Sequence, residues 1–365
     1  MRVLVVDDST LFRKFVRDAL LELPDVEVVG VAANGKIALE KLETLCPDLL
    51  TLDIEMPELD GLGVLRELRQ RHSSVGVILL SAFTGAGARM TTTGLGLGAF
   101  DFVLKPTGNN AKDSLATLRN DLLPKVKAFV ESRRTKNSQS VSRRLASDVS
   151  ASPCTVTEHA TPEVIVIGVS TGGPKALATL LPKLPADLPV PVMIVQHMPP
   201  LFTATLAADL NRDCRLNVCE AQDYQRVEPG NIYIAPGGKQ MGLVGHSRPR
   251  GEVGVSVPMR IRITDDEPER GCKPSVDYLF RSAAEIYDHR VLAVVMTGMG
   301  DDGTAGCRIL KQHGAQVVAQ NEASCVVYGM PRSVVEAGLA DIVCPLDHIA
   351  TTIGKLVGQG RLLCK

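Results

Sequence analysis

The sequence lacks any apolar run long enough to span a membrane. Its first residues, Met-Arg-Val-Leu-Val-Val-Asp-Asp, reach the acidic Asp7 and Asp8 too early for a secretory signal peptide. The nine cysteines include no Cys-x-x-Cys pair, and their odd number argues against a disulfide framework or a zinc site. We therefore expect no membrane insertion, reduced thiols and a cytoplasmic location.

An excess of charge of one sign is also missing. The chain carries 40 Lys and Arg against 41 Asp and Glu, so its composition implies no broad attraction to nucleic acid. Tryptophan is absent, which excludes no class of protein. The length of 365 residues is ample for two or more domains. We expect no nucleic-acid partner.

Residues 1–125 alternate short apolar segments with amphipathic ones. This alternation predicts an open, doubly wound parallel sheet, in which functional groups gather at the carboxyl ends of the strands. The segments predicted as strands are 2–6, 26–31, 49–53, 75–81 and 100–104. The segments predicted as helices are 11–23, 35–45, 61–71 and 111–129.

Three aspartates, Asp7, Asp8 and Asp53, stand at the ends of predicted strands. Converging carboxylates do not all stay ionised without a cation, so we expect a hard divalent metal such as Mg²⁺ here. Ser81 ends a further predicted strand, and Lys105 directly follows another. A carboxylate beside a metal, a hydroxyl and a lysine suits phosphoryl transfer onto that carboxylate. Taken singly, each aspartate could equally cap a helix.

Four motifs in this region resemble the receiver domain of bacterial response regulators. They are Val-Val-Asp-Asp-Ser, Leu-Asp-Ile-Glu-Met-Pro followed by Asp-Gly, Leu-Leu-Ser-Ala, and Phe-Val-Leu-Lys-Pro. The resemblance implies that Asp53 accepts the phosphoryl group and that Mg²⁺ binds Asp8, Asp53 and the backbone carbonyl of Glu55, supported by Asp7. It also implies that Ser81 and Lys105 contact the phosphoryl oxygens and that Phe102 is the switching aromatic residue.

The fourth helix of such a domain would fall on 85–98, which contains five glycines and three threonines. Glycine in a helix interior costs about 1 kcal/mol relative to alanine. We therefore expect this helix to be frayed or mobile.

The apolar periodicity stops between 131 and 163, where the sequence is polar and rich in serine and arginine. Such a segment buries too little apolar surface to order itself, so we predict a flexible linker over 126–162. Strands and helices alternate again over 163–360, which predicts a second, mostly parallel α/β domain. Its predicted strands are 164–167, 191–196, 232–235, 260–263, 291–296 and 315–319, and a hairpin is expected within 240–256.

The second domain opens with Ile-Gly-Val-Ser-Thr-Gly-Gly-Pro, which predicts a strand, a tight turn and a helix starting near Pro174. The pattern Gly-x-Ser-x-Gly fits the nucleophile elbow of serine hydrolases, with Ser170 as nucleophile. A plain turn and a phosphate-binding loop fit these residues as well. The dinucleotide pattern Gly-x-Gly-x-x-Gly is not met, because Ser170 occupies its second glycine position.

Two further polar positions follow predicted strands: His197, and Asp301 or Asp302. A serine needs a base to take its proton, and a histidine base needs an acid on its other nitrogen. A parallel sheet brings these strand ends to one edge, so the three groups can meet. His197 as a structural residue and the aspartate as a helix cap are the alternatives.

Six motifs resemble the CheB family of chemotaxis protein-glutamate methylesterases. They are Ile-Gly-Val-Ser-Thr-Gly-Gly-Pro, Val-Gln-His-Met-Pro, Ile-Ala-Pro-Gly-Gly, Pro-Ser-Val-Asp-Tyr-Leu-Phe, Thr-Gly-Met-Gly-Asp-Asp-Gly and Gln-Asn-Glu-Ala-Ser-Cys. The resemblance implies Ser170 as nucleophile, His197 as base and Asp302 as the residue that orients the base. The backbone N–H of Met299, with a second amide near Ser170 or Thr171, would form the oxyanion hole.

The resemblance further implies hydrolysis of glutamate γ-methyl esters, and deamidation of glutamines, on the cytoplasmic helices of chemoreceptors. It implies a chemotaxis histidine kinase as phosphodonor, Mg²⁺ for the receiver and no cofactor for the esterase. Two other functions remain open. The chain could be a transcriptional regulator, which would need a basic recognition helix, or its second domain could bind a ligand without hydrolysis.

Overall fold

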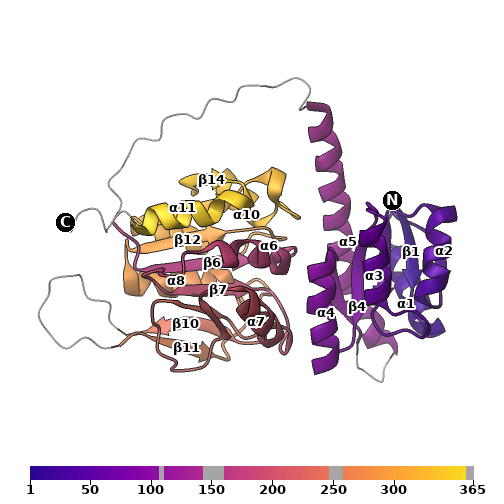
Figure 1. Cartoon of the computed structure of the whole chain (residues 1–365), viewed down its shortest axis with the longest axis horizontal. Coiled ribbons are helices and arrows are strands. Elements are labelled where there is room, and N and C mark those ends of the chain that lie inside the picture. Colours follow the sequence, from indigo (N-terminus) through magenta and orange to yellow (C-terminus); the bar gives the residue numbers. More distant parts are fainter. Residues whose placement is uncertain (107–110, 143–159, 246–257, 359–365) are drawn as a thin grey trace, which may run out of the picture. The chain divides into compact units, whose positions relative to one another are not determined.

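The computed structural model describes residues 1–106, 111–142, 160–245 and 258–358. The chain divides into two compact units, Met1–Val141 and Ser142–Lys365, which are described separately (Figure 1). In each unit, apolar strands form a parallel sheet and the helices connect them. The predicted α/β class is confirmed for both.

The first unit contains a five-stranded parallel sheet in the order β2-β1-β3-β4-β5. Its central strands are buried on both faces, which explains their continuous runs of Val, Leu and Ile. The strands are β1 (Arg2–Val6), β2 (Glu27–Ala32), β3 (Leu49–Asp53), β4 (Gly76–Ser81) and β5 (Asp101–Leu104). The helices are α1 (Thr10–Leu20), α2 (Gly35–Leu45), α3 (Gly61–Gln70), α4 (Gly85–Leu97) and α5 (Ala111–Ser142).

This strand order places the ends of β1, β3, β4 and β5 side by side at the carboxyl edge of the sheet. Four helices begin at this edge with side-chain caps: Ser9 accepts from the N–H of Phe12, Asn34 from Ile37, Asp60 from Gly63 and Thr84 from Gly87. The sheet thereby gathers the polar residues that the sequence places after each strand.

The helix predicted over 111–129 is longer in the structure than in the prediction. Helix α5 continues to Ser142, so the first part of the segment predicted as linker is helical. Beyond the predicted end, Arg133 contacts Asp48 and Arg134 contacts Asp25, and these ion pairs tie the helix to the sheet loops. Residues 143–159 lie outside the described part of the chain, and a linking role for 126–162 stays a prediction.

The second unit contains a seven-stranded parallel sheet in the order β14-β13-β12-β6-β7-β9-β8. The strands are β6 (Val164–Val169), β7 (Val192–Gln196), β8 (Asn217–Glu220), β9 (Asn231–Ile234), β12 (Val291–Val295), β13 (Gln316–Gln320) and β14 (Ile342–Cys344). The sequence pattern missed β8 and β14, which are only four and three residues long. The adjacent strands β12, β6 and β7 form the centre of the sheet.

The antiparallel pair differs from the predicted hairpin within 240–256. Strand β10 (Gln240–Val244) pairs with β11 (Arg260–Thr264), and residues 246–257 between them are not among those described. The helices of this unit are α6 (Gly173–Leu180), α7 (Phe202–Asp213), α8 (Val276–Tyr287), α9 (Thr304–Gln312), α10 (Met330–Glu336) and α11 (Leu346–Gly358). In Figure 1, α8 lies beside the strands of this sheet, where Leu279, Phe280 and Ala283 join the buried core. None of the helices among the described residues has the length and apolar character needed to cross a bilayer.

Candidate functional site

Ser170 follows the last residue of β6, at the start of the turn that leads into α6. This turn needs glycine at two positions. Gly172 has φ of 79°, in the left-handed region, and a Cβ on Gly173 would lie 1.9 Å from Oε1 of Gln196. Pro174 occupies the first turn of α6. The predicted strand, tight turn and helix are confirmed.

Backbone hydrogen bonds fix Ser170 from both sides. Its N–H donates to the carbonyl of Thr297 at 3.0 Å, and its carbonyl accepts from the N–H of Gly173 at 2.8 Å and from Nε2 of Gln196 at 3.0 Å. The hydroxyl itself donates to and accepts from none of the described residues. The backbone is therefore rigid, while the hydroxyl is available for chemistry.

His197 follows β7, the strand next to β6 in the sheet, and its N–H donates to the carbonyl of Val169 at 3.1 Å. Asp302 comes from the loop after β12, the neighbour of β6 on the other side. The Nε2 atom of His197 lies 2.8 Å from Oδ2 of Asp302. The sheet thus brings the sequence-predicted His197 and Asp302 into direct contact across more than 100 residues of chain.

Asp302 is buried and accepts three more hydrogen bonds besides that of His197. The donors are the hydroxyl of Ser275 at 3.0 Å and the backbone N–H groups of Val276 at 2.7 Å and Asp277 at 3.0 Å. These donors belong to the start of helix α8, where positive partial charge favours a carboxylate. The start of α8 therefore fixes Asp302 in position for His197.

The pKa values of His197 and Asp302 are both shifted by their mutual contact. Burial opposes ionisation of His197, but its hydrogen bonds to Asp302 and to Cys272 outweigh burial and raise its pKa from 6.5 to about 9. Burial would raise the pKa of Asp302, but the hydrogen bond and charge of His197 outweigh it and lower that pKa. Both groups are therefore ionised at neutral pH, and the Asp302 carboxylate stabilises the charged imidazole.

The second ring nitrogen of His197 faces a residue that the sequence analysis missed. Nδ1 lies 4.0 Å from Sγ of Cys272, which stands on the loop before α8. Ser170 and His197 are on neighbouring strand ends, yet no hydrogen bond joins their side chains in the described structure. No local pattern pointed to Cys272, because it belongs to no recognised arrangement of cysteines.

The predicted oxyanion residues lie at the same edge of the sheet. A Cβ on Gly298 would lie 2.8 Å from Cβ of Ser170, so the loop that carries Met299 packs directly against the serine. The N–H of Met299 donates to none of the described residues. Thr171 is buried, and its carbonyl accepts from the hydroxyl of Thr297 at 3.0 Å.

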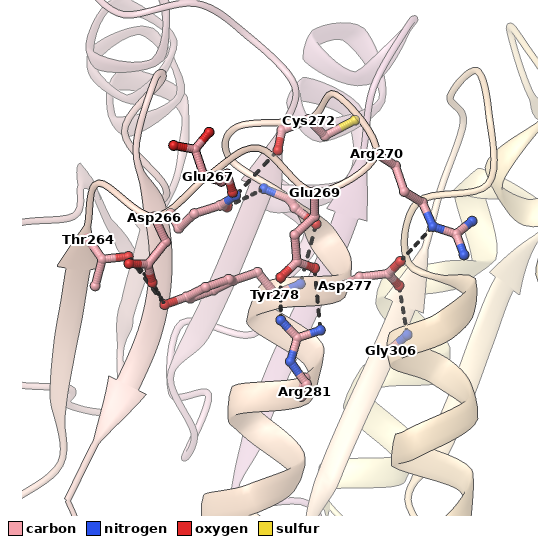
Figure 2. Close-up of polar contacts among 12 residues, drawn as sticks. Thr264, Asp266, Glu267, Glu269, Arg270, Cys272, Asp277, Tyr278, Arg281 and Gly306 are labelled. Carbon is pink, nitrogen blue, oxygen red and sulfur yellow. Dashed lines mark hydrogen bonds and ion pairs between the residues drawn. The ribbon is translucent and has the colours of Figure 1, made fainter.

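The loop between β11 and α8 forms a polar network beside this site (Figure 2). Asp277 accepts from the N–H groups of Gly303 at 2.9 Å and Gly306 at 2.6 Å, and so holds the start of α9 next to Asp302. Glu269 pairs with Arg281. In Figure 2 the Cys272 sulfur points away from Glu269 and Arg281. Asp277 was quoted in a sequence motif but assigned no role there.

A second polar cluster lies at the carboxyl edge of the first sheet. One ligand atom from each of Asp7, Asp8 and Asp53 can be chosen so that all lie within 4.8 Å of one another. Nζ of Lys105 lies 2.7 Å from Oδ2 of Asp7 and 2.7 Å from Oδ2 of Asp53. Burial, together with the charge of Asp7, raises the pKa of Asp53 to about 6, against the influence of Lys105. These oxygen donors, strained by mutual repulsion, fit a hard divalent cation.

The other predicted receiver residues lie on β4 and β5 and just after β3, the neighbouring strands of this sheet. The N–H of Glu55 donates to Oδ1 of Asp53 at 3.4 Å. The hydroxyl of Ser81 accepts from Oγ1 of Thr91 in α4 at 2.7 Å. Phe102 is buried, and Nζ of Lys125 lies 5.4 Å from its ring centroid.

Comparison with known proteins finds one matching family model in each unit. A family model described as CheB methylesterase matches residues 165–353, and one described as response regulator receiver domain matches residues 3–115. The chain is 47% identical over 361 residues to a protein-glutamate methylesterase/protein-glutamine glutaminase of Desulfotalea psychrophila, covering 97% of each. It is 41% identical to the Bacillus subtilis protein of that name, covering 99% of this chain and 100% of the relative.

The solved structures include a match to the second unit. The crystal structure of the Thermotoga maritima CheB methylesterase catalytic domain is 40% identical, with a TM-score of 0.50. The match covers 54% of this chain and 100% of the other.

Proposed function

The chain belongs to the CheB methylesterase family and joins that domain to a response regulator receiver, and from this premise we propose how its residues perform and control the reaction. It is a protein-glutamate methylesterase/protein-glutamine glutaminase. The observation that carries the assignment of residues is the contact of His197 with Asp302 at 2.8 Å, at the sheet edge where Ser170 follows the adjacent strand.

The hydrogen bond to Asp302 selects the tautomer of His197. When Nε2 carries the proton that Asp302 accepts, the lone pair of the neutral ring is on Nδ1. Nδ1 takes the proton of the Ser170 hydroxyl, which no described residue engages in a hydrogen bond, and Oγ attacks the side-chain carbonyl carbon of a methylated glutamate. The imidazolium that forms is stabilised by Asp302.

The developing oxyanion is stabilised by the N–H of Met299 and an amide near Thr171. When the tetrahedral intermediate collapses, Nδ1–H of His197 gives its proton to the leaving methoxide, which departs as methanol. Water, deprotonated by the same Nδ1, then cleaves the acyl-serine ester and restores Ser170 and the glutamate carboxylate. A glutamine side chain follows the same course and releases ammonia.

In the receiver, Asp53 accepts the phosphoryl group from a chemotaxis histidine kinase. Asp7, Asp8 and Asp53, with the backbone carbonyl of Glu55, would hold Mg²⁺, which when bound offsets the charge of the carboxylates and of the phosphoryl oxygens. Lys105, already between Asp7 and Asp53, would contact the phosphoryl group. Ser81 would also contact the phosphoryl group, once its hydrogen bond with Thr91 is broken.

Phosphorylation adds roughly −2 charge at Asp53, which biases Ser81 and Phe102 between two arrangements. We expect the unphosphorylated receiver to inhibit the esterase and its phosphorylation to release that inhibition. The substrates are methylated chemoreceptors, and the reaction takes place in the cytoplasm. A role as a binding module without hydrolysis is not favoured, because it would leave the His197–Asp302 pair without a use.

The test is methanol release from methylated receptor membranes, with and without a small phosphodonor and Mg²⁺. We expect release that rises with phosphodonor and disappears in Ser170→Ala. Asp53→Asn is the matched control, because it should keep basal release and lose the stimulation. Release that persists in Ser170→Ala would overturn the assigned nucleophile, and equal release with and without phosphodonor would overturn the regulation.

A further inference from the structure

Cys272 lies on the side of His197 that the Asp302 contact leaves open. We propose that the Cys272 thiolate and Nδ1 of His197 form a binding site for a thiophilic divalent cation of the Zn²⁺ type. A cation bound there occupies the lone pair that Ser170 needs and inhibits the esterase reversibly. Metal binding stands on the geometry alone, and only the inhibitory consequence rests on the proposed role of His197 as base.

The distance between the two donor atoms suits a shared cation. Bond lengths of about 2.3 Å to sulfur and about 2.0 Å to nitrogen, at a tetrahedral angle, place the donors roughly 3.6 Å apart. Sγ of Cys272 and Nδ1 of His197 lie 4.0 Å apart, so a small closing movement is sufficient. The ligand atoms of Cys272, His197 and Asp302 can also be chosen within 4.8 Å of one another.

Asp302 prepares His197 for a cation as well as for catalysis. Metal-bound histidines usually donate their other ring N–H to a carboxylate, which fixes the tautomer and makes the ligating nitrogen more basic. The Nε2–Asp302 contact of 2.8 Å has this arrangement. Asp302 is itself held by the Ser275 hydroxyl and two backbone N–H groups, so the supporting carboxylate is already fixed in place.

The backbone of Cys272 is also held in place, and the residue is reachable from solvent. The N–H of Cys272 donates to the carbonyl of Glu269 at 2.8 Å, and its own carbonyl accepts from Glu269 at 3.1 Å and from Nε2 of Gln240 at 3.3 Å. The residue is partly exposed, so a cation can enter from solvent. Binding releases the thiol proton to solvent, changes no oxidation state and leaves water to complete the coordination.

Donor softness separates this site from that of the receiver. Thiolate and imidazole prefer Zn²⁺, whereas the carboxylates of Asp7, Asp8 and Asp53 prefer Mg²⁺. The full chain in excess Mg²⁺ therefore still offers the Cys272–His197 pair to a thiophilic ion.

Cobalt(II) absorption provides a readout independent of catalysis. We expect the full chain, titrated with Co²⁺ in excess Mg²⁺, to show a near-ultraviolet band from thiolate coordination. Cys272→Ser should lose this band, whereas Cys219→Ser, which removes another partly exposed thiol, and Ser170→Ala should keep it. A band that survives in Cys272→Ser, or no band in the unaltered chain, would overturn the site.

Inhibition is then measured as methanol release against free Zn²⁺, each variant scaled to its own metal-free rate. We expect Cys272→Ser to need at least about tenfold more Zn²⁺ for half inhibition than the unaltered chain and Cys219→Ser. A chelator should restore the rate. Equal sensitivity of all three would overturn the inhibitory role, and failure of the esterase assay itself would leave the Co²⁺ result to decide metal binding.

Discussion

Nε2 of His197 and Oδ2 of Asp302 lie 2.8 Å apart, and the same carboxylate accepts hydrogen bonds from the first residues of α8. The orientation of the imidazole thus depends on a helix start that is itself part of the buried core. Buried side chains and backbone donors leave Asp302 little freedom, so the His197 ring has one preferred tautomer.

Replacing Asp302 by asparagine should lower kcat strongly while leaving substrate binding nearly unchanged. An amide NH₂ facing Nε2 favours the tautomer in which Nδ1 carries the proton, and that nitrogen then cannot act as base. We expect a loss of roughly 10³- to 10⁴-fold, the size of effect that a wrong tautomer has in serine proteases. Steady-state methanol release measures it.

Asp301→Asn is the control for this variant. Asp301 is exposed and pairs with Arg270 at the surface, where an ion pair contributes little. Its removal should change kcat by less than about twofold, in line with the small value of such pairs. A large loss in Asp301→Asn, with a small one in Asp302→Asn, would exchange the roles of the two aspartates.

The rate should rise with pH through the titration of His197. Its pKa is raised to about 9, so the ring is protonated at neutral pH and becomes a base only as pH increases. The same shift contributes stability that is fully present below about pH 6.5 and is lost as pH rises through about 9. We expect kcat/KM, corrected with Ser170→Ala for spontaneous hydrolysis, to increase between pH 7 and 9.

Cys272→Ser tests whether Cys272 contributes to the raised pKa of His197. Cys272 and Asp302 both raise the pKa of His197. Loss of the thiol should therefore move the ascending limb of the profile to lower pH, while the limb itself remains. The midpoint belongs to the whole cluster and not to one residue. An unmoved profile would show that Cys272 has no influence on the base.

The sequence was sufficient to predict those residues of the site that come soon after the central strands. Ser170, His197 and Asp302 each follow one of three neighbouring strands, and the apolar runs before them made the strands visible. A parallel sheet then brings such residues to one edge. The two short strands β8 and β14 carry too few residues for a pattern, and α5 was predicted too short because its last turns are polar and show no apolar periodicity.

Contacts that depend on loop conformation could not be predicted from the sequence. Cys272 reaches His197 only because the loop before α8 returns to the sheet edge, and no local pattern specifies that path. The same holds for the Ser81–Thr91 bond, which joins a strand end to a helix ten residues later. Resemblance to a family gave residue roles but not these contacts.

Asp277 should act as a positioning residue for Asp302. It accepts from Gly303 and Gly306 at the start of α9, and its own N–H donates to Asp302. Asp277→Ala leaves two buried N–H groups without an acceptor, which should cost about 1–3 kcal/mol for each group. We expect lower stability to urea and a reduced kcat, with partial rescue in Asp277→Asn, whose carbonyl oxygen still accepts.

Asp266→Ala is the comparison for Asp277. Asp266 stands on the loop that leads into α8, and among the described residues it accepts only from the side chains of Tyr278 and Thr264 near the surface. Its removal should change urea stability by less than about 1 kcal/mol, because exposed hydrogen bonds contribute little net. Equal effects of the two substitutions would argue that the loop as a whole, and not the Asp277 contacts, supports the site.

Helix α4 offers two glycines that should respond to alanine in opposite directions. Gly96 is exposed, and nothing lies within 4 Å of where its Cβ would be, so Gly96→Ala should stabilise the helix by about 0.5–1 kcal/mol. A Cβ on Gly87 would lie 2.3 Å from the carbonyl oxygen of Ala82, so Gly87→Ala should destabilise the helix by about 1–3 kcal/mol.

The measurement is amide hydrogen exchange of 86–97 in the unphosphorylated full chain. Fast exchange is expected in the unaltered protein, slower in Gly96→Ala and faster in Gly87→Ala. Protection of 86–97 as high as that of the central strands would show that its glycines do not make α4 mobile.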